Sequence, residues 1–391
     1  MPIEIRPYTP ADRESVFTAM TVVYGDGSPP EPEDELPAQR SHFVAMDRDV
    51  CVGFFAEFHF DTLRGAGTLP TGGLAMVGVV PERRHTGVGG DLMRFAIHDM
   101  RRRGKAIASL YPFAESYYRQ FGYEVCGSRL KITCPKSYLP KLKPPLGIRR
   151  LKWEEFDQIK PCYEVFAKSR SGLAERDGYL WDRLFGKKSK SPTLAYEKTV
   201  YAAGDPVEAY AVVSHAVDFH VEQSVSELAW CSAKGYESML TFMRSLAANK
   251  SGLQWYEPSD SPFYFRHLAS SALGEVLLEK TIMYRILNVP AALSALRTSA
   301  NAEFTLSVSD PEISENEGPW RVRSLDGQVA VEKTITADLQ FDIRSFTQAY
   351  LGQPSIDDVI RNGHAAAASG KAIDAFRTLM PSAPVYCLDM F

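Results

Sequence analysis

A basic, glycine-rich turn between an apolar strand and an amphipathic helix carries the residues whose types and spacing best suit chemistry. The turn runs from Arg83 to Gly90 and follows the β-branched run 76–80, which Pro81 ends. The helix after it shows one apolar face, made of Val88, Leu92, Met93, Ala96, Ile97 and Met100. Because a helix N-terminus presents backbone N–H groups and the positive end of its dipole, this stretch predicts a phosphate-binding loop.

The spacing of the glycines separates this loop from two common phosphate motifs. The dinucleotide fingerprint needs a third glycine where Leu92 stands, and the ATP-type loop needs Lys followed by Ser or Thr. What remains, Arg84-x-x-Gly87-x-Gly89 after an apolar strand, resembles the acetyl-CoA motif of the GNAT acetyltransferases. The resemblance implies acetyl-CoA as cosubstrate and no metal. The alternative is an ordinary strand-to-helix turn with surface arginines.

A tyrosine-rich segment follows the next apolar run, residues 105–110, which predicts a buried strand. When an amine attacks a thioester, a phenol with a pKa of about 10 can protonate the leaving thiolate, whose thiol has a pKa of about 8.5. In the GNAT pattern this strand splays away from its neighbour and the acyl-pantetheine enters the gap. Register with the family implies that Tyr118 is the general acid and that Tyr117 and Tyr123 are packing residues. The alternative is that all three are core aromatics.

The resemblance also implies which residues hold the cosubstrate. Its pantetheine would pair with the backbone of Val77, Gly78 and Val79. Its pyrophosphate would be cradled by His85, Thr86, Gly87, Val88, Gly89 and Gly90, and its pantetheine arm would be lined by Phe113 and Ala114. The family's loop often carries arginines where this chain has His85 and Thr86. This difference from the family pattern affects the expected affinity for phosphate.

Length and composition restrict the class of protein. The 391 residues suggest two or three domains, and a formal net charge of −4 argues against a general nucleic-acid binder. The chain has no apolar run of membrane-spanning length and its first residues lack a signal-peptide core, so neither a membrane nor a nucleic acid is an expected partner. The six scattered cysteines indicate reduced thiols and a cytoplasmic location, not a disulfide framework or a zinc site.

The segments before the loop predict a sheet. Residues 3–6 alternate as a first strand, and Thr9 is a plausible cap for a helix. Residues 25–37 predict a loop, either a solvated tip or an acidic lip that attracts a cationic amine. Residues 50–60 alternate as a long strand, paired with 74–80 through a Gly-rich connection at 65–73. His59 on that strand is either a hydrogen-bonded sheet histidine or a catalytic group.

A Pro-rich break at 141–147 predicts a domain boundary. The strands and helix that follow echo the first unit, but their turn, residues 232–236, lacks the Arg-x-x-Gly-x-Gly pattern. Beyond residue 286, strands around an Asp326-Gly327 turn precede helices, one of them capped by Ser355, and this order resembles a sterol-carrier-like domain. The whole chain resembles the enhanced intracellular survival (Eis) acetyltransferases. The expected fold is α/β (α+β), with an active GNAT domain at 1–145, a degenerate GNAT-like domain at 146–285 and a sterol-carrier-like domain at 286–391.

In that family the chain end is catalytic, which implies that the C-terminal carboxylate of Phe391 is the general base. A carboxylate with a pKa of about 3.5 must then act through proximity, a raised pKa or water. The family acetylates primary amines such as aminoglycosides, polyamines or lysine side chains. Its members are often hexamers, so the resemblance also implies a homo-oligomer.

Two other classes of protein compete with this interpretation. A lipid-binding or scaffold protein would carry a vestigial acetyltransferase half, but the intact Arg84-x-x-Gly87-x-Gly89 argues against a dead copy. An N-terminal protein acetyltransferase is the third hypothesis. Two extra domains and an apolar chain end disfavour the peptide groove that it needs.

Overall fold

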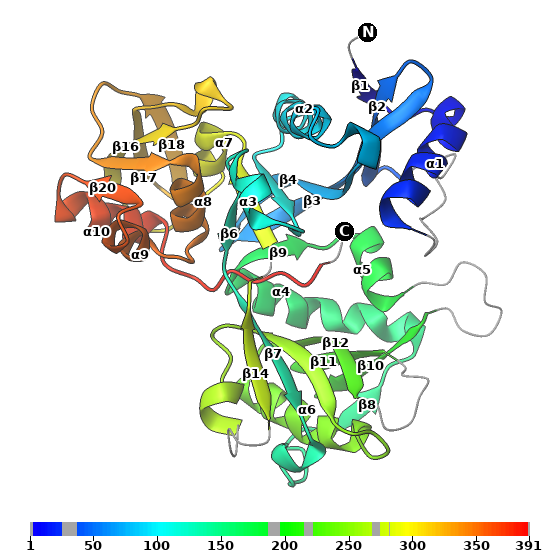
Figure 1. The fold of residues 1–391 in the computed structure, drawn as a ribbon. Coiled ribbons are helices and arrows are strands. Elements are labelled where there is room, and N and C mark those ends of the chain that lie inside the picture. The colour runs from blue at the N-terminus through cyan, green and yellow to red at the C-terminus, as the bar shows by residue number, and fades with distance from the viewer. Residues whose placement is uncertain are drawn as a thin grey trace.

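The computed structural model describes residues 3–25, 37–186, 196–214, 222–267, 274–280 and 282–389. Within these residues the chain forms three sheets, each at the centre of one lobe (Figure 1). The loop predicted at 25–37 lies outside the described residues except for Gly25 and Pro37. No helix in the described part of the chain is long and apolar enough to cross a membrane.

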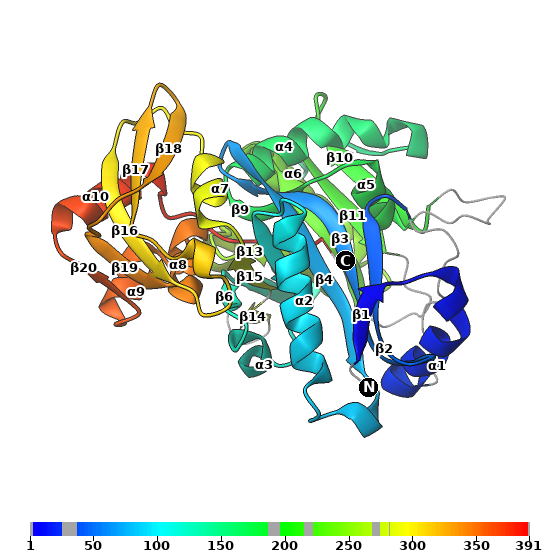
Figure 2. The same cartoon turned by 90° about the horizontal axis from the view of Figure 1, so that it is seen from above.

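The first sheet carries the predicted phosphate loop. Its strands follow the order β1 (Glu4–Pro7), β2 (Arg40–Asp47), β3 (Val50–Arg64), β4 (Gly67–Val79), β5 (Ile107–Leu110), β15 (Ile282–Ile286) and β6 (Glu124–Cys126), and β9 (Ser171–Glu175) pairs with the far end of β3. Two helices, α1 (Arg13–Tyr24) and α2 (Val88–Arg102), pack on it, and Figure 2 shows α2 crossing β3 and β4. Every residue of the predicted apolar face of α2 is at most 2% exposed. The helical period of that stretch is therefore confirmed.

The connection predicted at 65–73 is wrong, because most of it is strand. Arg64 pairs with Gly67, so β3 and β4 form one long hairpin whose turn is only Gly65 and Ala66. Gly72 lies within β4, and its lack of a side chain lets α2 pack closely: an added Cβ would lie 2.2 Å from Met100 Sδ. Glycine in this strand marks close packing of a helix rather than a loop.

The second sheet has the order β14 (Glu275–Glu279), β7 (Arg129–Cys134), β13 (Leu253–Pro258), β12 (Gln223–Trp230), β11 (Ala209–Ser214), β10 (Lys198–Ala203) and β8 (Ile148–Arg150). Helices α4 (Lys160–Lys168) and α6 (Ala233–Leu246) cover its two faces, since Tyr210 of β11 packs in the cluster with α4 and Ala211 in the cluster with α6. The predicted echo of the first unit is therefore present in the fold.

The first two lobes exchange strands. Strand β15, which lies near residue 285 in sequence, enters the first sheet between β5 and β6. Strand β7, which precedes the Pro-rich break, joins β13 and β14 in the second sheet. By sequence, β15 belongs to the second predicted range and β7 to the first. By hydrogen bonding, β15 belongs to the first sheet and β7 to the second. The domain ranges 1–145 and 146–285 therefore stay a prediction. In the structure the two lobes are interlocked, because each contains a strand from the other range.

The third sheet has the order β18 (Gln328–Lys333), β17 (Trp320–Leu325), β16 (Glu303–Ser309), β19 (Leu339–Asp342) and β20 (Ala365–Ala367). It forms one core with α7 (Val289–Ser294), α8 (Ile343–Leu351), α9 (Ile356–Arg361) and α10 (Gly370–Leu379). The expected Asp326-Gly327 turn joins β17 to β18, and the expected cap Ser355 accepts a hydrogen bond from the backbone of Asp358. The strand-then-helix order of this domain is confirmed.

A buried ion pair joins this third domain to the first sheet. Arg285 of β15 donates to Asp310, just after β16, with N–O distances of 2.7 and 3.1 Å, and both side chains are fully buried. Asn316 donates to the same carboxylate at 2.8 Å. Removing one partner of such a pair leaves a buried, uncompensated charge.

We expect Asp310→Ala to destabilise the protein by about 3–5 kcal/mol, because Arg285 would stay buried without its partner. A lower midpoint of thermal unfolding, followed by circular dichroism, is the measurement. Glu303→Ala, which removes an exposed partner of Arg323, is the control and should leave the midpoint near that of the wild type. Equal midpoints for the two variants would contradict the assignment of this pair as a tie between the domains.

Candidate active site

The site begins where β4 and β5 part. The two strands pair in parallel from Thr71 with Ile107 to Leu74 with Leu110, and β4 then continues alone to Val79. The β5-facing edge of residues 75–79 is therefore open over the very stretch expected to hold a pantetheine. The predicted splay of this strand is present in the structure.

A β-bulge changes the direction of the C-terminal end of β4. Ala75 pairs with Ala56 and Gly78 with Phe54, so that Met76 and Val77 together oppose one residue of β3. Met76 has a φ of 54°, which is the left-handed region that non-glycine residues rarely adopt. Bulges of this kind bend the strand and turn the edge at which pairing ends.

The glycine-rich loop follows directly. Gly87 precedes α2 as its N-cap with a φ of 99°, a value that favours glycine. Because Gly87 has no side chain, it leaves the first N–H groups of α2 open to a ligand. Arg84 on the loop donates to the carbonyl of Val79 at 3.2 Å and also lines the pocket.

A pocket of about 830 Å³ joins the open edge of β4 to this loop. Eight of the predicted site residues line it: Val77, Gly78, Val79, His85, Gly87, Gly89, Gly90 and Phe113. The pocket combines a peptide edge, a helix N-terminus and basic side chains in one concave surface. That combination fits a long ligand with an amide-containing arm and a phosphate group.

The other predicted residues lie beside the pocket rather than on its wall. Val88 is 2% exposed and packs in the core under α2, and the Thr86 hydroxyl donates to the carbonyl of Arg83 at 2.7 Å. Ala114 is the N-cap of α3 (Glu115–Arg119). Their backbones continue the loop and the turn that shape the wall.

The tyrosines divide between the pocket and the core. Tyr117 is half-buried and lines the pocket, whereas Tyr118 is 3% exposed and packs behind Tyr117 and Phe113, with ring centroids 5.1 and 5.4 Å away. Burial, together with the phenols of Tyr117 and Tyr24, raises the pKa of Tyr118, so it stays protonated at neutral pH. Tyr123 is fully buried, as expected of a packing residue.

Sequence reasoning missed several residues that line the pocket. Val23 and Tyr24 come from the end of α1, and Asp91, Arg94, Gln120 and Phe121 come from α2 and the turn after α3. Helical spacing could have found Arg94, because it lies one turn after Gly90 on the same helix. The end of α1 reaches the pocket only through tertiary packing.

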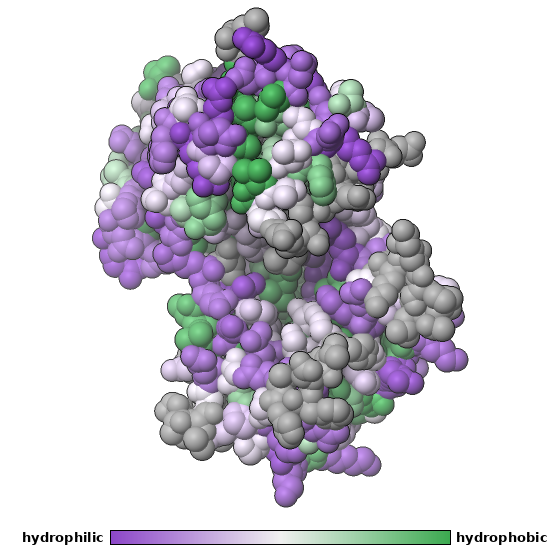
Figure 3. Space-filling model, turned by 45° about the vertical axis from the view of Figure 1, so that its right-hand side comes forward, coloured by the Kyte–Doolittle hydropathy of each residue, from purple (hydrophilic) through white to green (hydrophobic). Residues whose placement is uncertain are grey.

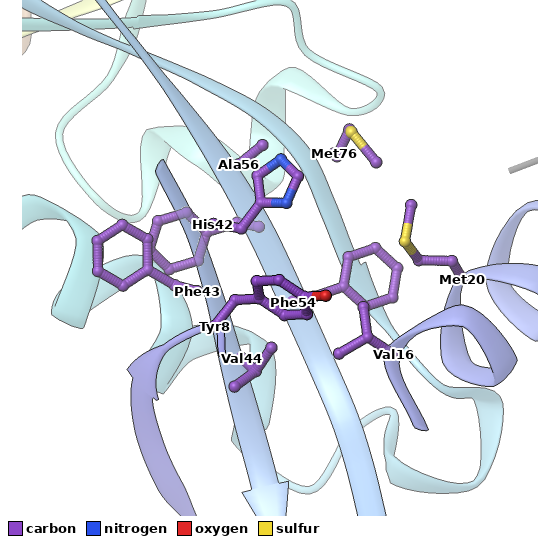
Figure 4. A pocket seen from close by; sticks show the side chains of 10 residues that line it. Tyr8, Val16, Met20, His42, Phe43, Val44, Phe54, Ala56 and Met76 are labelled. Atoms are coloured by element: carbon purple, nitrogen blue, oxygen red, sulfur yellow. The ribbon is translucent and has the colours of Figure 1, made fainter. Parts of the chain in front are cut away.

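A second cavity lies between α1 and strands β2 and β3 (Figure 4). Its volume is about 20 Å³, and Figure 4 shows Tyr8 and His42 among apolar side chains such as Met20 and Met76. Burial, aided by Arg40, lowers the pKa of His42 to about 4, so its ring is neutral. A space of this size holds about one water molecule. It is not a substrate site.

His59 lies in the sheet with polar partners on both ring nitrogens. Its Nε2 is 2.9 Å from Ser41 Oγ, and its Nδ1 is 3.2 Å from Glu57 Oε1. Glu57 is fully buried and also accepts from Arg103. Of the two interpretations, this geometry favours a hydrogen-bonded sheet histidine. Its neighbours Ser41 and Glu57 lie on β2 and β3, and Glu57 contacts Arg103 at the C-terminal end of α2, whereas the pocket lies at the N-terminus of that helix.

The equivalent turn in the second lobe is closed. At the start of α6, Ser232 accepts a hydrogen bond from the backbone of Gly235 at 2.9 Å and donates to the Glu208 carboxylate. An added Cβ on Gly235 would lie 2.5 Å from the carbonyl oxygen of Glu208. A carboxylate and a backbone carbonyl therefore occupy the space near this helix N-terminus, which disfavours a phosphate there.

Comparisons with known proteins match two parts of the chain to known domains. Residues 4–126 match the family model of the acetyltransferase (GNAT) domain, and residues 289–388 match that of the sterol carrier protein domain. A Streptomyces avermitilis protein named an uncharacterized N-acetyltransferase is 27% identical over 330 residues, which cover 79% of each chain. The crystal structure of a GCN5-related N-acetyltransferase from Anabaena variabilis has a TM-score of 0.84 at 18% identity, over 100% of both chains. Eis1 from Mycobacterium abscessus has a TM-score of 0.78 at 20% identity, also over 100% of both chains.

The fold and the matches together define a GNAT-type acyltransferase. The chain carries a GNAT acetyltransferase domain at its start, a second GNAT-like lobe and a sterol carrier protein domain at its C-terminal end. The predicted resemblance to the Eis-like architecture is confirmed at the level of the fold. Enzymes of the GNAT fold use acetyl-CoA to acetylate amines.

We expect Gly87→Ala to raise the dissociation constant for coenzyme A about tenfold, because a Cβ at a φ of 99° costs about 1–2 kcal/mol in the loop geometry that presents the N–H groups. Gly104→Ala is the matched control. Gly104 has a φ of 83°, and an added Cβ meets nothing within 4 Å at either position, but Gly104 follows the other end of α2. Isothermal titration with coenzyme A should separate the two variants. Equal affinities would show that the loop does not bind the phosphates.

Proposed function

We propose that this enzyme transfers an acetyl group from acetyl-CoA to a primary amine, with Tyr118 as general acid and the carboxylate of Phe391 as general base. The observation that carries the proposal is the pocket where the open edge of β4 meets the uncapped N-terminus of α2. The edge of residues 77–79 suits the amides of pantetheine, and the loop from His85 to Gly90 suits the pyrophosphate. The acetyl thioester would then lie at the β4–β5 parting.

Acetyl transfer to a neutral amine needs one proton removed and one supplied. The ammonium first releases one proton to solvent, which frees the lone pair of the nitrogen. The neutral amine nitrogen then forms a bond to the thioester carbonyl carbon, and its second proton passes to the base. The C–S bond then breaks, and the thiolate of coenzyme A takes a proton from a phenol. Solvent returns a proton to the phenolate, and the base releases its own to solvent, so atoms and charges balance. Phe391 lies outside the described residues, but Asp389, two residues earlier, is buried between the lobes.

Two tyrosines compete for the acid role, and their positions support Tyr118 over Tyr117. A Cβ added to Gly89 would lie 2.7 Å from the Tyr117 hydroxyl, so that phenol lies over the glycine-rich loop, at the phosphate end. Tyr118 is only 3% exposed and lies behind Tyr117, with 5.1 Å between the ring centroids. We therefore assign the protonation of sulfur to Tyr118 and a contact with coenzyme A to Tyr117.

The acceptor is expected to be a cationic amine such as an aminoglycoside, a polyamine or a lysine side chain. Figure 3 shows a hollow between the upper and lower parts of the molecule on this face. The acidic residues of 26–36, which formed the predicted lip, lie outside the described residues. The homo-oligomeric state and the cytoplasmic location stay predictions.

We expect Tyr118→Phe to lower kcat for acetyl transfer about 100-fold while leaving the affinity for coenzyme A unchanged, since general acid catalysis contributes a factor of about 10²–10⁴. Tyr117→Phe is the matched control and should keep kcat within about threefold, because its hydroxyl lies at the phosphate end of the site. Thiol release from acetyl-CoA, measured against a panel of polyamines and aminoglycosides, is the assay.

A chain that ends at Met390 tests the base in the same assay. Loss of most turnover with intact coenzyme A binding would support Phe391, and an unchanged kcat would remove it from the mechanism. A wild-type protein that binds coenzyme A but acetylates none of the panel would have another acceptor class. A wild-type protein that binds no coenzyme A would favour the lipid-binding or scaffold alternative.

A further inference from the structure

The last described residues of the chain are bound between the lobes rather than fraying from α10. Ser171 of β9 donates its backbone N–H to Pro384 at 3.0 Å, and Tyr386 donates to the carbonyl of Ser171 at 2.9 Å. The tail also passes close to Gly127, where an added Cβ would lie 2.1 Å from the carbonyl oxygen of Val385. Figure 1 shows this tail, in red, leaving the third lobe and crossing between the other two.

The tail ends in a buried network of charges, which we call the Asp389 clasp and define as Asp389, Arg176 and Glu227. Arg176 Nε donates to Asp389 Oδ1 at 2.6 Å, and Arg176 Nη1 donates to Glu227 Oε1 at 2.8 Å. The three side chains are between 1% and 4% exposed. Tyr210 donates to Glu227 at 2.6 Å, and the guanidinium lies 4.1 Å from the ring of Tyr163.

A hydrogen bond from the catalytic domain holds the backbone of the same residue. The Tyr111 hydroxyl donates to the carbonyl oxygen of Asp389 at 3.0 Å. Tyr111 directly follows β5 and stands two residues before Phe113, which lines the coenzyme A pocket. Asp389 is thus tied to the wall of the active site through its carbonyl and to the second lobe through its carboxylate.

Burying the three charged groups of the Asp389 clasp carries a large desolvation cost for a contact that is only structural. One guanidinium lies between two carboxylates, and burial raises the pKa of Asp389 against the attraction of Arg176. Apolar side chains of similar volume often stabilise a protein as well as a buried ion network does, so such networks are retained where they fix one geometry. Here the fixed geometry is the direction in which the chain leaves Asp389.

We propose that Asp389, Arg176 and Glu227 are positioning residues that aim the terminal carboxylate at the reacting amine. This inference rests on the proposed role of Phe391. Two residues beyond Asp389 span at most about 7 Å, so fixing Asp389 limits how far the chain end can reach. The second GNAT-like lobe supplies Glu227 and Tyr210. It contributes to catalysis by holding the chain end, although its own phosphate loop is closed.

The test is a double-mutant cycle that combines Asp389→Asn with a chain ending at Met390. In the full-length enzyme, Asp389→Asn should lower kcat about 100-fold, the effect expected of a catalytic group displaced by about 1 Å, with the KM for acetyl-CoA unchanged. In the truncated chain the terminal carboxylate belongs to Met390 and ends one residue, about 3.5 Å, short, so the same substitution should change kcat by less than about twofold.

Two further variants separate positioning from stability. Asp310→Asn weakens another buried arginine–aspartate pair and should lower the unfolding midpoint while leaving kcat nearly unchanged below that midpoint. Tyr111→Phe removes the bond to the Asp389 carbonyl and the 3.8 Å contact with Cys387 Sγ, and it provides a milder variant if Asp389→Asn fails to fold. It should also lower kcat in the full-length enzyme alone.

The outcomes are distinguishable. An unchanged kcat for the truncated chain would overturn the base role of Phe391 and the positioning role with it. A truncated chain that loses turnover, together with Asp389→Asn and Tyr111→Phe variants that keep it, would overturn the positioning role alone. Equal effects of Asp389→Asn in both backgrounds would also overturn it, because the residue would then act independently of the chain end.

Discussion

The parting of β4 from β5 is the constraint on which the rest of the molecule depends. The two strands share only the four pairs from Thr71 to Leu74, and the remaining edge of β4 must then find its hydrogen bonds elsewhere. A sheet that opens in this way loses pairing on one side of β5, and β15 restores it on the other. The exchanged strand thus holds β5 in place while leaving the gap open for a ligand.

The two GNAT-like lobes differ at the N-terminus of the helix that follows the central strand. Both place a helix after a central strand, and both helices bury one apolar face. At α2 the N-cap is Gly87, with no side chain and a left-handed backbone, whereas at α6 Ser232 and Glu208 already satisfy that position. A helix N-terminus binds an anion only when its N–H groups are not already satisfied by the protein.

Contacts between distant parts of the chain interlock the lobes. Strand exchange, the Arg285–Asp310 pair and the tail along β9 each join parts of the chain that are far apart in sequence. These links are hydrogen bonds and ion pairs in places with little water, where geometry is held tightly. The three domains therefore position one another, although every described residue that lines the large pocket belongs to the first of them.

The sequence by itself determined the local chemistry: the helical period of α2, the glycine-rich turn, the Asp326-Gly327 hairpin and the Ser355 cap. Each of these depends on residues within a few positions of one another, so pattern and propensity suffice. Only the tertiary structure decided that Gly72 faces a helix, that β15 and β7 change lobes and that Tyr24 reaches the pocket. It also decided that Arg176 and Glu227 meet Asp389. Those contacts join residues tens to hundreds of positions apart, and their partners are chosen by packing and burial of charge, which no local pattern encodes.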